Sequence, residues 1–266
     1  MELKILDKNT FEDYLMDYKY KNFLQSSKME QVYKLSGWEI TYVGIVDKEE
    51  IKAATLLLSL KNKLNKKFFY APRGLLVDYN DDKILKEFIN KLKKYIKNQK
   101  GYMLRIDPVI PRVERDIDGN IIDGGYNNEW IVNKLINLGC KHLGYNVGTD
   151  VSKQVNWVFQ LNLDGKTVDK VFSDFKPNVR NNINKVKKYG IQISELDYDD
   201  LPIFKKITQD TSERIGFLDK SIEYYQKMYR SFHDCNEIKF LLATIDLKQY
   251  LDTLNFDLKE HKQKLL

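Results

Sequence analysis

The sequence contains few of the residues on which metal-dependent or nucleophilic catalysis usually rests. Only two of its 266 residues are cysteine, Cys140 and Cys235, and neither has a second cysteine at metal-ligand spacing. Isolated cysteines of this kind are typical of a reducing compartment, where they act as small buried hydrophobes. The three histidines, His142, His233 and His261, form no H-x-x-x-H pair or similar cluster. We therefore expect no metal site.

Long apolar segments are scarce as well. The amino-terminal residues MELKILDKNTFEDYL lack the apolar core of a signal peptide. No uncharged apolar run approaches about 18 residues, the length that a helix needs to span a bilayer. Together with the isolated cysteines, these features predict a cytoplasmic protein without a transmembrane segment.

What the sequence does contain is typical of a folded globular protein. Hydrophobic residues make up 42% of the chain and charged residues 31%, and the length suits one large domain or two smaller ones. The net charge is +6, from 44 basic and 38 acidic residues. An excess this small permits a polyanionic partner without requiring one.

One stretch of the first half combines a strand with a sharp break. Residues 68–79, FFYAPRGLLVDY, begin with an aromatic run typical of a strand and continue into Arg73. A proline precedes this arginine, and Gly74 after it is expected to adopt backbone angles that are costly for other residues. A second strand-like run, 102–106, ends in Asp107. Two interpretations remain open at this point. Arg73 and Asp107 lie at two strand ends that face a common cleft, or the stretch is an ordinary turn with a surface salt bridge, which the local sequence alone favours.

Periodicity and chain breakers predict alternating helices and strands in the first half. The expected helices cover residues 9–18, 26–35, 84–96 and 129–138, and the expected strands cover residues 3–6, 39–46, 51–60, 67–71, 102–106, 142–147 and 157–163. Asn9 or Thr10 is expected to cap the first helix, and Ser26 or Ser27 the second. This order is that of an acyltransferase-type α/β domain built on a mixed sheet.

Two loops of this half resemble ligand-binding loops only in part. Coenzyme-A-using members of that fold hold a pyrophosphate on a glycine-rich loop. The corresponding stretch here, 73–78, has one glycine and an aspartate, so we expect a donor other than acyl-coenzyme A. The polar loop 108–128 contains IDGNIIDGG, which lacks the regular ligand spacing and the closing glutamate of a calcium loop.

The second half begins with the most basic stretch of the chain, KPNVRNNINKVKKYG over 176–190. It is predicted to form a helix that begins at Pro177, with a buried stripe of Val179, Ile183 and Val186. The cations on another face of this helix are expected either to contact phosphates or simply to be solvated.

The rest of the second half repeats the helix-helix-strand order of the first. The expected elements are a strand over 191–194, helices over 201–214 and 221–232, and a strand over 239–245. In the tail, leucines at 247, 251, 254, 258 and 265 follow three- and four-residue steps and one longer step. They form a coiled-coil seam of under three heptads, which needs a partner helix.

Five segments together resemble the FemABX family of peptidoglycan-branching aminoacyltransferases, with similarity to its FemX- and MurM-type members. They are FLQSSKMEQVYKLSGW (23–38), FFYAPRGLLVDY (68–79), YMLRIDP (102–108), VRNNINKVKKYG (179–190) and TSERIGFLDKSIEYYQKMY (211–229). The resemblance covers essentially the whole chain. It implies two acyltransferase-like, GNAT-type domains with mixed sheets, and a coiled-coil arm inserted in the second. We therefore expect a first domain over 1–155, an incomplete second domain over 156–246 and the first helix of the arm over 247–266.

The resemblance implies a tRNA-dependent aminoacyltransferase that acts on the stem-peptide amine of a peptidoglycan precursor. An aminoacyl ester is already activated, so the enzyme need only orient an amine and stabilise the oxyanion, which explains the lack of a nucleophilic triad. The implied partners are aminoacyl-tRNA and a lipid-linked or nucleotide-linked precursor, with possible peripheral contact with the inner membrane face. No cofactor is expected. The chain by itself is expected to be weakly active or inactive.

The resemblance also assigns roles to individual residues. The precursor-contacting positions of the family are matched by Tyr102, Asp107, Lys220 and Tyr224. Lys220 replaces an arginine of some relatives, which keeps the charge for a diphosphate but loses the bidentate fork. A further family lysine falls on Tyr33, so neighbouring Lys34 is expected to substitute for it. Arg73 completes the predicted substrate-binding set.

Asp107 is expected to form a hydrogen bond with the precursor. Accepting a proton from the attacking ammonium is a second role, which requires a raised pKa, and capping a strand end is the alternative to both. Arg180, Lys187 and Lys188 are expected to bind tRNA phosphates. Two other functions remain open, a coenzyme-A N-acyltransferase of the same fold and a non-catalytic remnant that binds precursor or tRNA.

Overall fold

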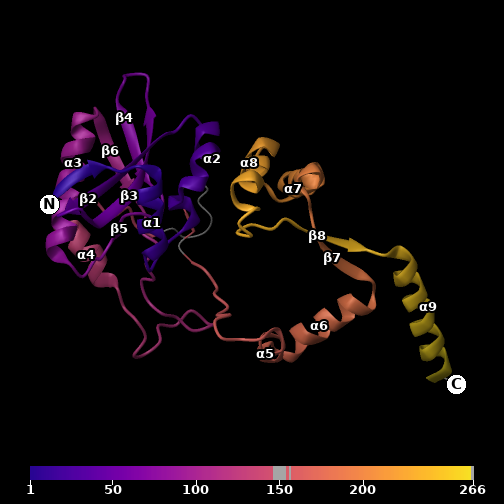
Figure 1. Ribbon diagram of the computed structural model, residues 1–266. Helices are drawn as coiled ribbons and strands as arrows, with labels where there is room; N and C mark the ends of the chain where they lie inside the picture. The colour runs from indigo at the N-terminus through magenta and orange to yellow at the C-terminus, as the bar shows by residue number, and fades with distance from the viewer. Residues whose placement is uncertain (146–153, 156, 265–266) are drawn as a thin grey trace. The chain divides into compact units, whose positions relative to one another are not determined.

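The computed structural model describes residues 1–145, 154–155 and 157–264. The chain divides into two compact units, Met1–Gln154 and Val155–Leu266. The first unit contains a large sheet with helices on it, and the second contains helices around a strand pair (Figure 1).

The first unit is built on one mixed sheet. Its strands are β1 (Glu2–Ile5), β2 (Glu39–Asp47), β3 (Glu50–Lys61), β4 (Lys67–Ala71), β5 (Leu76–Val77) and β6 (Gly101–Ile106). The order across the sheet is β1-β2-β3-β4-β6, and β5 pairs with β3. All pairs are antiparallel except β4 and β6, which run parallel. The predicted α/β class with a mixed sheet is confirmed.

Helices cover both faces of this sheet. They are α1 (Lys8–Asp17), α2 (Glu30–Leu35), α3 (Asp82–Asn98) and α4 (Glu129–Asn137). The apolar stripe of α3, which includes Leu85 and Phe88, packs with Val43 and Leu57 in one cluster. On the other face Phe11 of α1 packs with residues of β2 and β3. Strand β3 is buried by both layers, and its near-continuous apolar run, AATLLLSL, fits that position.

Two of the predicted helix starts need correction. Asp7, rather than Asn9 or Thr10, caps α1, because its carboxylate accepts hydrogen bonds from both of their backbone N–H groups at 3.0 Å. Residues 26–35 are not one α-helix, since two 3-10 turns, Phe23–Gln25 and Ser27–Met29, precede α2. Ser26 caps the second of these turns.

Two predicted strands are wrong where the structure describes them. Residues 142–145 and 157–163 have no strand conformation, and residues 146–147 of the first prediction lie outside the described part. Val158 and Phe159 are 66% and 91% exposed. Apolar composition favours a strand, but a strand forms only where a neighbour completes the hydrogen-bond ladder.

The second unit follows the predicted order more closely. Its elements are α5 (Val168–Asp174), α6 (Pro177–Lys188), β7 (Ile191–Glu195), α7 (Leu201–Ile215), α8 (Ile222–Phe232), β8 (Leu241–Ile245) and α9 (Leu247–Lys264). Strands β7 and β8 pair antiparallel. The small helix α5 was not predicted.

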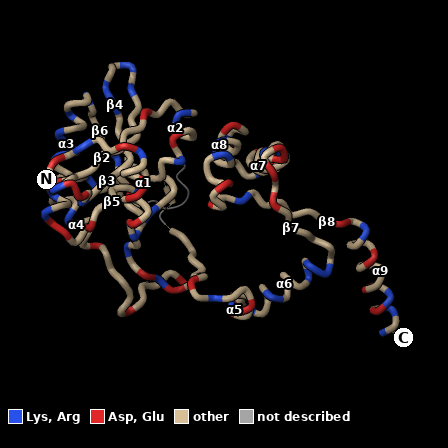
Figure 2. The backbone as a smooth tube through the Cα atoms, in the orientation of Figure 1, with Lys and Arg blue, Asp and Glu red and all other residues tan. Residues whose placement is uncertain are grey.

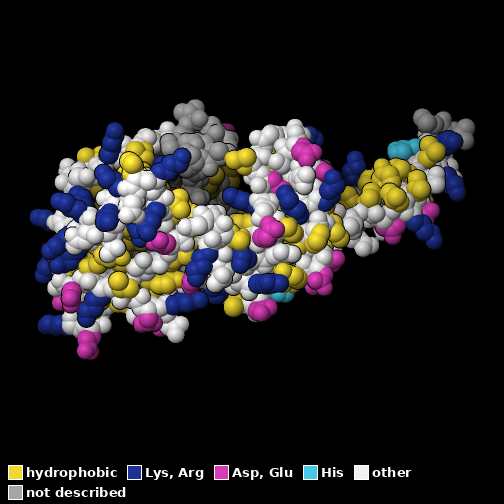
Figure 3. All heavy atoms as spheres, turned by 90° about the horizontal axis from the view of Figure 1, so that it is seen from above, with side chains coloured by type: hydrophobic (Ala, Val, Ile, Leu, Met, Phe, Trp, Pro, Cys, Tyr) yellow, Lys and Arg dark blue, Asp and Glu magenta, His cyan; other side chains and the backbone are white. Residues whose placement is uncertain are grey.

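Two amphipathic helices of this unit leave their apolar stripes uncovered. In α6 no residue is buried, and Val179 and Val186 are 37% and 41% exposed, so the predicted buried stripe is wrong. In α9 Leu247, Leu251 and Leu258 are more than half exposed, and Figure 3 shows hydrophobic side chains gathered along this helix. Within the described residues, no helix combines the length and apolar character that crossing a membrane requires.

Candidate functional site

The ends of β4 and β6 bring Arg73 and Asp107 together. Because the two strands are parallel and Ala71 pairs with Ile106, the residues that follow each strand lie at the same edge of the sheet. One oxygen of the Asp107 carboxylate accepts a hydrogen bond from the backbone N–H of Arg73 at 2.6 Å. The other oxygen accepts from the hydroxyl of Tyr70 at 2.9 Å. The carboxylate is therefore fixed by the backbone of the turn as well as by a side chain.

The turn after β4 depends on Arg73 and Gly74 in different ways. The left-handed backbone conformation falls on Arg73, whose φ is 56°, and not on the glycine. Gly74 is required for space, since a Cβ there would lie 2.6 Å from the hydroxyl of Thr55 and 3.2 Å from the amide nitrogen of Gln25. The prediction that Gly74 adopts the unusual backbone angle is therefore wrong. Arg73 adopts it, and a glycine is needed at position 74 because there is no space for a Cβ. This close packing aims the N–H of Arg73 at Asp107.

Gln25 anchors this turn to the centre of the sheet and was not singled out from the sequence. Its side chain is fully buried, and its amide nitrogen donates to the carbonyl of Pro72 at 2.6 Å. Its amide oxygen accepts from the backbone N–H of Leu56 at 2.8 Å and from the hydroxyl of Thr55 at 3.1 Å. A buried amide with this many partners positions the turn rigidly. The available signal was only a glutamine directly after two apolar residues in FLQSS.

The surroundings of Asp107 change its acidity. Burial raises the pKa of the Asp107 carboxyl above its ordinary value of 3.8. The hydrogen bonds from Arg73 and Tyr70, and the charges of Arg73 and Arg105, oppose this rise without cancelling it. Burial also raises the pKa of the Tyr70 hydroxyl, and the Asp107 carboxylate adds to that effect. Tyr70 therefore remains a neutral hydrogen-bond donor, and Asp107 is a better proton acceptor than an exposed carboxylate.

Tyr102 lies at the opposite end of β6 from Asp107. The pairing with β4 slips by one residue at this point, because Lys67 faces Gly101 and Phe68 faces Met103. Tyr102 is thus the extra residue of a β-bulge, and it is 55% exposed. Asp107 lies five residue steps further along the extended chain, roughly 16 Å. A substrate that contacts both residues must extend along β6.

Aromatic rings and a cation line the strand between these two ends. The ring of Phe68 lies 6.4 Å from that of Tyr102 and 6.1 Å from that of Trp38. The guanidinium of Arg105 lies 5.9 Å from the centre of the Phe68 ring. This row suits a flat or amphipathic ligand that stacks on one side and carries negative charge on the other.

Lys34 is held on α2 by a neighbour. Its ammonium pairs with Glu30 one helical turn earlier, and its side chain is 51% exposed. Tyr33, onto which the sequence resemblance places a family lysine, donates its hydroxyl to the carbonyl of Leu24 at 2.7 Å. The tyrosine therefore has a structural role here, and Lys34 is the cation nearest in sequence.

Lys220 and Tyr224 lie together in the second unit, at the start of α8. The Lys220 ammonium lies 5.5 Å from the centre of the Tyr224 ring. Asp219, which was not predicted, holds this segment in place. Its carboxylate is 7% exposed, pairs with Lys205, and accepts hydrogen bonds from the hydroxyl of Tyr225 at 2.7 Å and the backbone N–H of Lys220 at 2.8 Å. Burial raises the pKa of Asp219, but these hydrogen bonds outweigh burial, so the net shift is downward.

Two of the three residues predicted to bind tRNA are engaged within the protein. The guanidinium of Arg180 donates to the carbonyls of Ser173 and Phe175 at 2.7 and 2.8 Å. The ammonium of Lys188 pairs with Asp257 of α9 at 2.6 Å, which raises its pKa. Lys187 is exposed, and no salt bridge joins it to another described residue.

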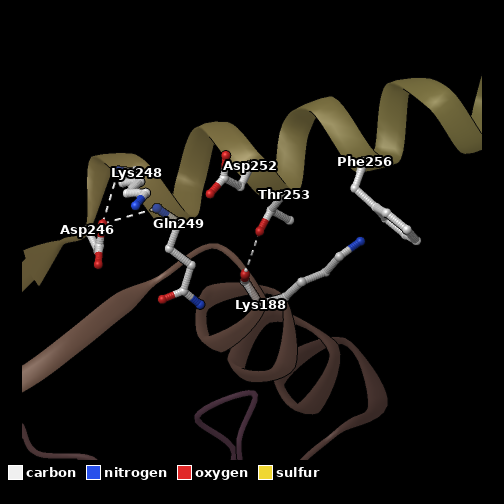
Figure 4. A pocket seen from close by; sticks show the side chains of 7 residues that line it. All are labelled: Lys188, Asp246, Lys248, Gln249, Asp252, Thr253 and Phe256. Carbon is white, nitrogen blue, oxygen red and sulfur yellow. Dashed lines mark hydrogen bonds between the residues drawn. The ribbon is translucent and has the colours of Figure 1, made fainter.

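A shallow pocket lies where α6 ends and α9 begins. In Figure 4 the side chains of Gln249 and Phe256 extend from α9 on either side of Lys188, and the Thr253 hydroxyl donates to the Lys188 carbonyl at 3.2 Å. The pocket is lined by Lys188, Asp246, Lys248, Gln249, Asp252, Thr253 and Phe256. Its lining contains two lysines and two aspartates, so it has no strong preference for an anion or a cation. Within the described residues, no group of three His, Cys, Asp or Glu side chains is placed to hold a metal ion.

The fold defines the chain as an α/β protein built on a mixed sheet. A family model, that of the FemAB family, matches residues 6–266. The chain therefore belongs to the FemAB family, as the sequence motifs predicted.

Similar proteins support this assignment. "Aminoacyltransferase FemA" of Staphylococcus aureus is 32% identical over 237 residues, which cover 89% of this chain and 56% of that protein. The FemA of Staphylococcus epidermidis is 31% identical over 256 residues, which cover 96% of this chain and 61% of the relative. The crystal structure of FemX shares the fold, with a TM-score of 0.75 and 24% identity, over 98% of this chain and 62% of FemX. The chain thus spans about three fifths of the length of these proteins.

Proposed function

We propose that the protein is a tRNA-dependent aminoacyltransferase of cell-wall synthesis. In this reaction an amino acid passes from aminoacyl-tRNA to the stem-peptide amine of a peptidoglycan precursor, as in the formation of an interpeptide bridge. The relatives named aminoacyltransferase FemA support the acyl-transferring chemistry. The observation that carries the proposal is the Asp107 carboxylate, which is fixed by Tyr70 and Arg73 and has a raised pKa.

In this reaction the protein needs to orient the two substrates and to transfer a proton. The precursor amine attacks the carbonyl carbon of the aminoacyl ester, a C–N bond forms, and the C–O bond to the tRNA ribose breaks. Asp107 accepts a hydrogen bond from the attacking amine and holds its lone pair toward the ester. Its raised pKa also suits it to take the proton that the nitrogen loses, which the leaving ribose oxygen finally receives. The Arg73 side chain supplies positive charge beside the same strand end.

The remaining predicted residues bind the precursor in this proposal. Tyr102 contacts the substrate at the far end of β6, and Lys34 contributes a cation from α2. In the second unit Lys220 neutralises a diphosphate, and Tyr224 packs against its ammonium. Asp219 acts as a positioning residue for both. The proposed location is the cytoplasm, with membrane association through a lipid-linked precursor.

A transfer assay tests the proposal directly. The chain is incubated with aminoacyl-tRNA carrying a labelled amino acid and with a nucleotide-linked or lipid-linked precursor, and S. aureus FemA serves as the positive control. Single-turnover conditions, with the protein in excess over the aminoacyl-tRNA, allow slow transfer by the 266-residue chain to be measured. Label in the precursor is the expected result. Acetylation of the precursor from acetyl-coenzyme A, without transfer from tRNA, would instead identify a coenzyme-A N-acyltransferase.

Lys187 is the residue of α6 that we expect to contact tRNA phosphate. Lys187→Glu should weaken tRNA binding and reduce the slope of log affinity against log salt by about one, because one fewer counterion is released. Filter binding or fluorescence anisotropy over a salt series measures this slope. Lys63→Glu, an exposed lysine on the turn between β3 and β4, makes the same charge change and serves as the control. If the two variants give the same slope, α6 is only a solvated surface.

A further inference from the structure

The outer face of α3 carries a stripe of lysines that the proposed function does not use. Lys83, Lys86, Lys94 and Lys97 are all exposed and lie along one side of the helix, as 3.6 residues per turn requires. The opposite side of α3 is the buried apolar stripe. Figure 2 shows basic residues recurring along this helix. Residues 83–97 extend over about 21 Å, at about 1.5 Å per residue.

The acidic residues of α3 do not neutralise this stripe. Asp82 pairs with Lys134 of α4 at 2.6 Å, and Glu87 pairs with Lys91 at 3.5 Å. Both carboxylates are therefore matched by cations outside the stripe. No salt bridge of the described residues involves any of the four stripe lysines. The face thus presents uncompensated positive charge to solvent.

The residue types in the stripe indicate which kind of polyanionic partner it suits. All four cations are lysines, which are point charges on flexible stems, whereas specific recognition of nucleic-acid phosphates favours the planar fork of arginine. Nor does the stripe include an aromatic residue on which a base could stack. The side of a helix is convex and cannot enclose a ligand. These properties suit a broad, fluid anionic surface that requires charge but no fixed donor geometry.

We infer that the α3 stripe binds the phosphate headgroups of anionic phospholipids at a membrane surface. The apolar face of α3 is occupied by the core cluster with Leu85, Phe88 and Leu92, so the helix does not insert into the bilayer. Binding is therefore electrostatic, and salt must release it, since the Debye length is about 10 Å at 0.1 M. The inference is independent of the transfer reaction, because the contact needs neither tRNA nor precursor.

Co-sedimentation with lipid vesicles tests this inference. The protein is expected to bind vesicles that contain phosphatidylglycerol and not to bind vesicles of phosphatidylcholine alone. Raising the salt concentration is expected to release it. The test variant replaces the four stripe lysines with glutamine. The control variant replaces four exposed lysines of α9 with glutamine, which removes the same net charge, and these are Lys248, Lys259, Lys262 and Lys264.

The stripe variant is expected to lose at least about tenfold in vesicle partitioning, because each lysine near an anionic surface contributes appreciably. The α9 variant should keep most of its binding. Circular dichroism confirms that both variants are folded. Equal losses in the two variants, or no binding of phosphatidylglycerol vesicles by the unsubstituted protein, would overturn the inference. So would a stripe variant that keeps vesicle binding and loses tRNA binding, which would make α3 a nucleic-acid surface.

Discussion

Replacing Asp107 with asparagine is expected to abolish amino-acid transfer while leaving the protein folded. The amide keeps the shape of the side chain and one acceptor oxygen, but it carries no negative charge and cannot take a proton. Transfer should fall by at least about a hundredfold, the usual size of a lost general-base contribution. The free energy of unfolding should change by only about 1–2 kcal/mol, since one hydrogen bond of the carboxylate is lost. Single-turnover transfer and urea unfolding measure the two effects.

The pH dependence separates a chemical role of Asp107 from a structural one. The attacking amine must be neutral, so the log of the rate rises with pH with a slope of one. If Asp107 must also be ionised, the slope increases to two below its pKa, which lies above 3.8. The asparagine variant should keep a slope of one throughout. Asp123→Asn, an exposed aspartate of the loop after β6, is the control for the substitution itself. Full activity of Asp107→Asn would remove the residue from the mechanism.

Gln25→Leu is expected to have the largest effect on stability. Leucine has nearly the same volume, but it leaves the Leu56 N–H and the Pro72 carbonyl without their buried partner, whereas the Thr55 hydroxyl keeps the Leu56 carbonyl at 3.3 Å. At about 1–3 kcal/mol for each uncompensated group, the free energy of unfolding should fall by roughly 3 kcal/mol or more. Chemical denaturation of the first unit, followed by circular dichroism, measures this loss.

The control for this substitution is Gln31→Leu, at an exposed position of α2. It should change the free energy of unfolding by less than about 0.5 kcal/mol, because the side chain of Gln31 remains in water in both states. If the two variants are equally stable, Gln25 is not the anchor of the Pro72–Gly74 turn. A folded Gln25→Leu protein that transfers normally would show that Asp107 does not need the turn.

The spacing of apolar residues correctly predicted those helices and strands that have a clear apolar face and a neighbouring element that covers it. The helix α3 and the hairpin strands β2, β3 and β4 formed where periodicity placed them. The same reasoning failed for residues 157–163 and for the stripe of α6, because apolar residues show a tendency to be buried without identifying what buries them. Burial is decided by the neighbours in space, which periodicity does not contain.

The candidate site was predictable in outline and not in detail. Two strands followed by chain breakers indicated that Arg73 and Asp107 would be close. The sequence did not indicate that the backbone N–H of Arg73, at a φ of 56°, would be the donor to the carboxylate. Gln25 was missed because its partners Leu56 and Pro72 lie 31 and 47 residues away along the chain.

The parallel pairing of β4 with β6 has a consequence for the nascent protein. The two hydrogen bonds that fix Asp107 join residues 34 and 37 positions apart, and α3 lies between them. A chain still emerging from the ribosome can form the β2–β3–β4 hairpins. The hydrogen bonds to the Asp107 carboxylate form only after β6 has been synthesised and α3 has packed on the sheet. The Asp107 carboxylate is thus fixed in one step, when β6 pairs with β4, and before that step Asp107 is an ordinary, water-exposed aspartate.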